Sequence, residues 1–64
     1  MTGYVYNVDT REIAYEIHGD TDVAIEAKFG DLNMDLDSYG ITYSPAFGFA
    51  DGLIRTEQTE ELTA

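Results

Sequence analysis

Residues 4–18 read YVYNVDTREIAYEIH, and this stretch decides the predicted fold. Two runs within it, 4–8 and 13–18, alternate large apolar residues with others. A period of two is typical of a half-buried β-strand. The polar residues 9–12 between the runs suit a short loop. The chain is therefore predicted to open with a β-hairpin.

The length of the loop determines which residues of the predicted hairpin pair. A loop of four residues pairs Tyr6 with Tyr15, whereas a loop of two residues pairs Tyr6 with Ile13. Cross-strand partners lie on the same side of a sheet. Both registers therefore place the large apolar side chains of the two runs, including Tyr4 and Tyr6, on one common face.

A helix and a third strand are predicted after the hairpin. Residues 19–22 (GDTD) offer N-cap side chains, and residues 22–29 (DVAIEAKF) are good helix formers, with Gly30 as the expected C-cap. Residues 39–43 (YGITY) are rich in β-formers, and Pro45 ends that strand. The expected fold class is α+β: a small antiparallel sheet with one helix packed on it, in the order ββαβ.

Residues 1–55 are expected to form a single domain. Leu53 and Ile54 supply a last apolar contact, either as a fourth strand or as an edge. Residues 56–64 are polar and acidic, and they are expected to be a frayed C-terminal tail.

The charge of the chain excludes several classes of protein. Among 64 residues there are 13 acids, 3 bases and no cysteine, so the formal net charge is −10. Without cysteine there is no disulfide scaffold and no thiolate zinc site. With few Lys and Arg residues, direct nucleic-acid binding is not expected. We see neither a signal peptide nor a membrane-length apolar run, and we expect a cytoplasmic protein without membrane contact.

The net charge is concentrated in residues 20–40, where six acids face one lysine. Within this block, residues 31–37 (DLNMDLD) alternate polar and apolar residues. If extended, they would place carboxylates about 6.6–6.8 Å apart on one side. Such a row resembles a nucleic-acid backbone and would suit the basic groove of a DNA-binding protein. The alternatives are an irregular loop anchored by its apolar side chains, and an acidic face that provides solubility only.

The same segment partly matches a calcium-binding loop. Asp31, Asn33 and Asp35 occupy the first three ligand positions of an EF-hand, but Leu36 and Thr42 stand where Gly and Glu are needed. We therefore predict no specific metal site and no cofactor.

The sequence does not predict an enzyme. His18 is the only histidine, and it falls on the polar face of the second predicted strand. Neither Ser38 nor Ser44 lies in the sequence pattern of an activated nucleophile. The simplest interpretation of His18 is a surface residue near acids.

Two aromatic residues are candidate anchors for a protein partner. Phe47 and Phe49 are flanked by glycines in the loop 46–52. Aromatic side chains ringed by acids make effective protein-binding patches. The alternative is that this loop folds back to cover the sheet.

Small size, high acidity, lack of cysteine and the ββαβ order together resemble phage-encoded anti-defence proteins, especially anti-CRISPRs and anti-restriction DNA mimics. The resemblance is one of type over the whole chain and rests on no motif, so it assigns no residue. It implies a stoichiometric inhibitor that binds a host CRISPR effector or similar nuclease complex and blocks its DNA-recognition groove.

The sequence thus predicts an acidic DNA mimic that competes for a basic, nucleic-acid-binding surface of a bacterial defence complex. The alternative is a small structural or regulatory protein-binding module that forms a homodimer, with acidity for solubility only. The predicted partner-binding residues are Asp20, Asp22, Glu26, Asp31, Asp35, Asp37, Phe47 and Phe49.

Overall fold

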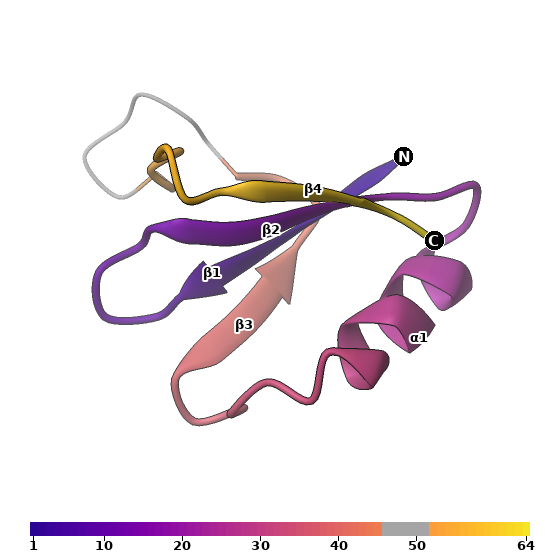
Figure 1. Ribbon diagram of the computed structural model, residues 1–64, viewed down its shortest axis with the longest axis horizontal. Helices are drawn as coiled ribbons and strands as arrows, with labels where there is room; N and C mark the ends of the chain where they lie inside the picture. The colour runs from indigo at the N-terminus through magenta and orange to yellow at the C-terminus, as the bar shows by residue number, and fades with distance from the viewer. Residues whose placement is uncertain (46–51) are drawn as a thin grey trace.

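The computed structural model describes residues 1–45 and 52–64 (Figure 1). Its elements are β1 (Thr2–Asn7), β2 (Ile13–His18), α1 (Asp22–Asp31), β3 (Tyr39–Thr42) and β4 (Glu60–Thr63). The described residues form one four-stranded sheet with the strand order β3-β1-β2-β4, and α1 packs on it. This confirms the α+β class, but the element order is ββαββ and not ββαβ.

The C-terminal residues form strand β4, which corrects the prediction of a frayed tail. β4 runs parallel to β2, with Glu61 opposite Glu16 and Leu62 opposite Ile17. The sheet is therefore mixed, whereas an antiparallel sheet was expected. This strand could not be predicted from the sequence because Leu62 is its only apolar side chain. Pairing of the backbone with β2, and the packing of Leu62 against the core, hold it in place.

The predicted hairpin forms, but a β-bulge changes its faces. Val5 lies opposite Tyr15, and Tyr6 lies opposite Ile13, so Ala14 has no partner across the hairpin. An extra residue on one strand shifts which side chains share a face. Neither predicted register is kept along the whole hairpin. The prediction of a single face that includes Tyr4 and Tyr6 is wrong.

The core lies between the sheet and α1. Val5, Ile17 and Ile25 are fully buried there. Partly buried apolar side chains from β2, β3, β4, α1 and the α1–β3 connection surround these three. Gly3 also lies on this side, since a Cβ atom at Gly3 would stand only 2.5 Å from Cγ2 of Ile25. The missing side chain of Gly3 therefore lets α1 approach the sheet.

The helix starts where the sequence predicts and ends later. The hydroxyl of Thr21 caps α1 by accepting a hydrogen bond of 3.1 Å from the amide of Ala24. Gly30 is not the C-cap, because the helix continues to Asp31. The chain reverses at Asn33, whose φ of 54° lies in the left-handed region that Asn tolerates. No helix in the described ranges is long and apolar enough to cross a membrane.

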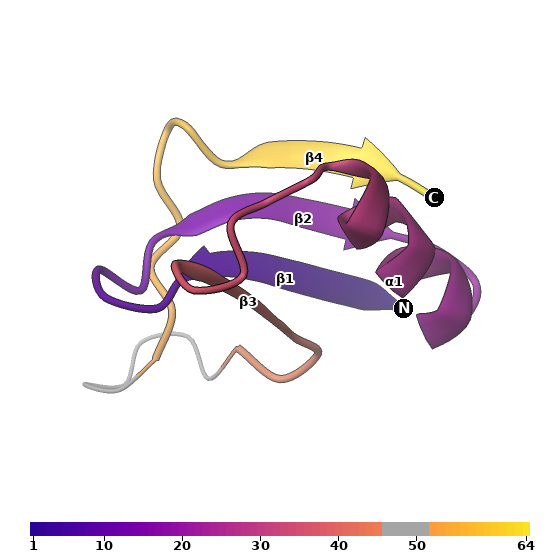
Figure 2. The same cartoon turned by 90° about the horizontal axis from the view of Figure 1, so that it is seen from below.

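The opposite face of the sheet is covered by the segment that leads to β4. Leu53 and Ile13 are buried, and the amide of Ile54 donates to the carbonyl of Arg11 at 2.9 Å. The hydroxyl of Thr59 donates to the carbonyl of Ile13 at 2.6 Å. Figure 2 shows this segment passing behind β2, on the side away from the α1–β3 connection. Thus α1 covers one face of the sheet, and the segment that leads to β4 covers the other.

Two glycines give a matched test of the helix–sheet contact. Gly3→Ala should lower the free energy of unfolding by about 1–3 kcal/mol, because the added methyl group overlaps the buried Ile25. Gly30→Ala should raise it by about 0.5–1 kcal/mol, because Gly30 is helical and an added Cβ atom would meet no atom from outside the helix backbone within 4 Å. Urea unfolding measures both changes. Equal effects of the two substitutions would contradict the close approach of α1 to Gly3.

Candidate functional site

The predicted partner-binding acids are all exposed and lie in one part of the chain. They are Asp20, Asp22, Glu26, Asp31, Asp35 and Asp37. The first four lie on α1 or just before it, and the last two lie in the turn between α1 and β3. The predicted anchors Phe47 and Phe49 fall outside the described residues.

The evenly spaced row of carboxylates over residues 31–37 does not form. Asp31 still belongs to α1, and the chain reverses at Asn33. A tight turn follows, in which the amide of Ser38 donates to the carbonyl of Asp35 at 3.0 Å. The segment is the irregular loop of the two alternatives, because Leu32 and Met34 pack against the core. The acids of the loop therefore project from a helix end and a turn.

Two acids of this region also hold the local structure. The carboxylate of Asp35 accepts hydrogen bonds from the amide of Asp37 at 3.1 Å and from the hydroxyl of Ser38 at 3.1 Å. The carboxylate of Asp22 accepts from the amide of Val23 at 2.9 Å in the first turn of α1. Substitution of either acid would change the backbone as well as the charge.

Tyr43 connects α1 with the segment after β3. Its hydroxyl donates to Oε2 of Glu26 at 3.2 Å and lies 3.4 Å from the carbonyl oxygen of Asp22. Loss of hydration raises the pKa of the Tyr43 phenol above its ordinary value of 10.0. The hydrogen bond to Glu26 and the negative charges of Glu26 and Asp22 raise that pKa further. The raised pKa of the phenol thus reflects loss of hydration first, and the hydrogen bond and negative charges of α1 second.

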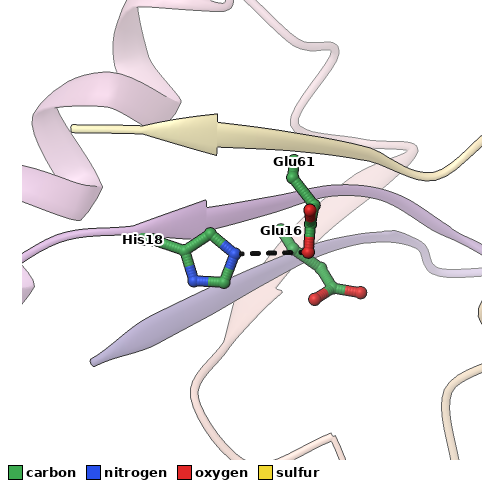
Figure 3. A group of neighbouring side chains, drawn as sticks. All are labelled: Glu16, His18 and Glu61. Carbon is green, nitrogen blue, oxygen red and sulfur yellow. Dashed lines mark ion pairs between the residues drawn. The ribbon is translucent and has the colours of Figure 1, made fainter.

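A second group of titratable side chains was missed from the sequence. Glu16, His18 and Glu61 each bring one potential ligand atom to within 4.8 Å of the other two (Figure 3). They lie on β2 and β4, on the sheet face opposite α1. The sequence could not indicate this group because it depends on the parallel pairing of β2 with β4. The period of two in β2 signals only that Glu16 and His18 share a face.

Each member of this group already has a polar partner. Glu16 is buried, with 2% of its side chain exposed, and it forms an ion pair with Arg55. Within the described residues its Oε2 atom makes no hydrogen bond, so the ion pair with Arg55 is what offsets the cost of burying the charge of Glu16. Nε2 of His18 lies 3.6 Å from Oε1 of Glu61, and Nδ1 of His18 is 3.0 Å from the hydroxyl of Thr2.

The chemistry of this group is that of two carboxylates and one imidazole. Such side chains can ligate a divalent transition metal, and the contact of Nδ1 with Thr2 leaves Nε2 directed toward Glu61. Arg55 competes with a cation for Glu16, because it already neutralises that carboxylate. The acids of residues 31–37, which match an EF-hand loop only in part, do not gather in this way among residues 1–45 and 52–64.

Comparison with models of protein families, with curated protein sequences and with solved structures gives no match for this chain. The candidate sites therefore rest on the residues and geometry described above.

The ion pair between Arg55 and Glu16 can be tested by stability. Arg55→Met leaves a buried carboxylate without its cation, and it should lower the free energy of unfolding by about 1–3 kcal/mol. Adding Glu16→Gln to Arg55→Met should restore part of that loss, because the amide carries no charge. Lys28→Met is the control of equal net charge. A double variant less stable than Arg55→Met would contradict this assignment.

The titration of Tyr43 tests the contact with Glu26. A raised phenol pKa means that Tyr43 stabilises the fold below about pH 10, and this contribution is lost as the pH rises through the raised pKa. Glu26→Gln should move the pKa of Tyr43 toward 10.0. Ultraviolet difference spectra against Tyr43→Phe isolate this tyrosine, and Glu57→Gln is the control. An unchanged Tyr43 titration in Glu26→Gln would exclude the contact.

Proposed function

We propose that this protein is a small acidic inhibitor that binds the basic, nucleic-acid-binding surface of a bacterial defence complex, such as a CRISPR effector. It acts stoichiometrically in the host cytoplasm as an anionic competitor of DNA, without catalysis or a cofactor. The proposal is supported by a net charge of −10 on 64 residues and by the exposure of six acids on and around α1.

The observation that carries the proposal is the placement of the bases relative to these acids. Arg55 pairs with Glu16 on the sheet face opposite α1. Lys28 is the only lysine, and it lies about 200° around the helix from Glu26. Arg11 lies in the turn between β1 and β2, outside α1 and the α1–β3 turn. Asp22 and Glu26 therefore face solvent without a base on the same helical face, whereas Asp31 lies about 60° around the helix from Lys28.

The geometry favours a patch of negative potential over a copy of the DNA backbone. The acids project from a helix, its end and a turn, and they do not form a straight row. Complementary charge on two proteins mainly speeds their encounter and fixes their orientation. The expected complex therefore forms fast at low salt and weakens as salt screens the charges.

A set of charge-neutralising variants tests the function. Asp20→Asn, Asp31→Asn and Asp37→Asn together should raise the concentration needed to inhibit DNA binding by a CRISPR effector about tenfold, because each removes an exposed charge. The control variant combines Glu12→Gln, Glu57→Gln and Glu60→Gln, so both proteins have a net charge of −7 by loss of three acids from −10. DNA-binding assays over a salt series provide the measurement.

Two results would overturn the proposal. One is the absence of inhibition at low salt across purified CRISPR effectors and restriction nucleases. The other is an equal loss of inhibition in the two variants, because it would mean that total charge acts and the acids around α1 have no special part.

The alternative function is a protein-binding module that forms a homodimer. It is favoured by β3, an edge strand whose residues Tyr39–Thr42 carry no charge and pair with β1 on one side. Sedimentation equilibrium separates the two functions. A stable dimer without a partner, insensitive to salt, supports the module and not the inhibitor.

A further inference from the structure

A groove of about 360 Å³ lies between α1 and β3. Its apolar walls are Phe29, Met34, Leu36 and Ile41, and Glu26 is its charged lining residue. Phe29, Met34 and Ile41 are half-buried, so the groove continues the core toward solvent. It exists because α1 packs on β1 and β2, where Gly3 admits it, and leaves the side next to β3 less covered.

Leu36 is held outward at the rim of this groove. It occupies a central position of the turn that the hydrogen bond from Ser38 to Asp35 closes. The carboxylate of Asp35 bonds to the amide of Asp37 and to the hydroxyl of Ser38, which fixes the turn. Leu36 is 72% exposed in this position. A fixed, exposed leucine beside an apolar groove provides a surface that an apolar side chain of a partner can cover.

The charges around the groove define what can enter it. Glu26 lines the groove, Asp31 follows the lining residue Gly30, and Asp35 and Asp37 flank Leu36 in sequence. None of the described lining residues is basic. A DNA strand, an anionic membrane or a second copy of this acidic surface would meet repulsion here, whereas a cationic segment would meet attraction.

We propose that the groove between α1 and β3 binds a Lys- or Arg-rich segment of the partner and receives one apolar side chain of that segment between Phe29 and Leu36. This inference rests on the proposed function in that the partner is a basic protein. The acids attract the segment and so raise its association rate. The apolar groove lowers its dissociation rate, because buried apolar contacts mainly slow dissociation.

The experiment uses two synthetic, fluorescein-labelled peptides and the intact protein. One is a Lys-rich peptide with a single central Leu, and the other has Gly in place of that Leu. The Leu peptide should bind about tenfold more tightly, as expected for the burial of one leucine side chain. Fluorescence anisotropy measures the affinities, and NMR chemical shifts should place the contact at Phe29, Leu36 and Ile41.

Two matched variants show where the apolar side chain goes. Leu36→Ser should remove most of the difference between the two peptides, while the weak binding of the Gly peptide remains. Val23→Ser is the control, because Val23 is 74% exposed on α1 and does not line the groove. Both residues are exposed, so neither substitution should unfold the protein.

The outcomes separate this inference from the proposed function. Equal affinity of the two peptides, no binding of either, or shifts confined to other surfaces would overturn the groove inference. So would groove shifts that depend only on protein concentration, because a second copy would then be the occupant. The proposed function is decided separately by the DNA-binding assay, where Leu36→Ser should weaken inhibition about tenfold and Val23→Ser should not.

Discussion

The close approach of Ile25 to Gly3 is the contact on which the rest of the structure depends. A side chain at Gly3 would overlap Ile25, so the helix reaches the fully buried core of Val5, Ile17 and Ile25 only because that position is glycine. Residues 1–45 and 52–64 place only these three fully buried residues in that core, so small losses of packing are a large part of the stability of so short a chain. The same contact places α1 over β1 and β2, and thereby opens the groove beside β3.

The sequence predicted the elements whose patterns are local. The hairpin strands, α1 and β3 were expected near their observed positions, because alternation and helix-capping residues act over a few positions. The bulge at Ala14 and strand β4 could not be predicted in this way. A bulge changes the faces without changing the composition of the strand. β4 forms because its backbone pairs with β2. Its own residues, EELT, show almost no apolar pattern.

The candidate sites also differ in whether local sequence could predict them. The acids around α1 were found because charge can be counted along the chain, but their geometry was not, since Asn33 and the turn at Asp35 break the expected row. Glu16, His18 and Glu61 come together only through β4. The buried position of Glu16 likewise could not be read from its alternating neighbours. It follows from the segment after residue 52, which covers that face and brings Arg55 to the carboxylate.

The parallel pairing of β4 with β2 has a consequence for the order in which the fold forms. Tyr15 pairs with Glu60, 45 positions later in the chain, whereas the hairpin of β1 and β2 closes over a short turn. Closure of the longer loop costs more conformational entropy, so β4 adds to a sheet whose other strands can already associate. As an edge strand with little apolar burial, β4 is also the part of the sheet most prone to local opening. Each opening would expose the hydrogen-bonding edge of β2, and the repulsion between two chains that each carry a net charge of −10 would oppose the pairing of another copy there.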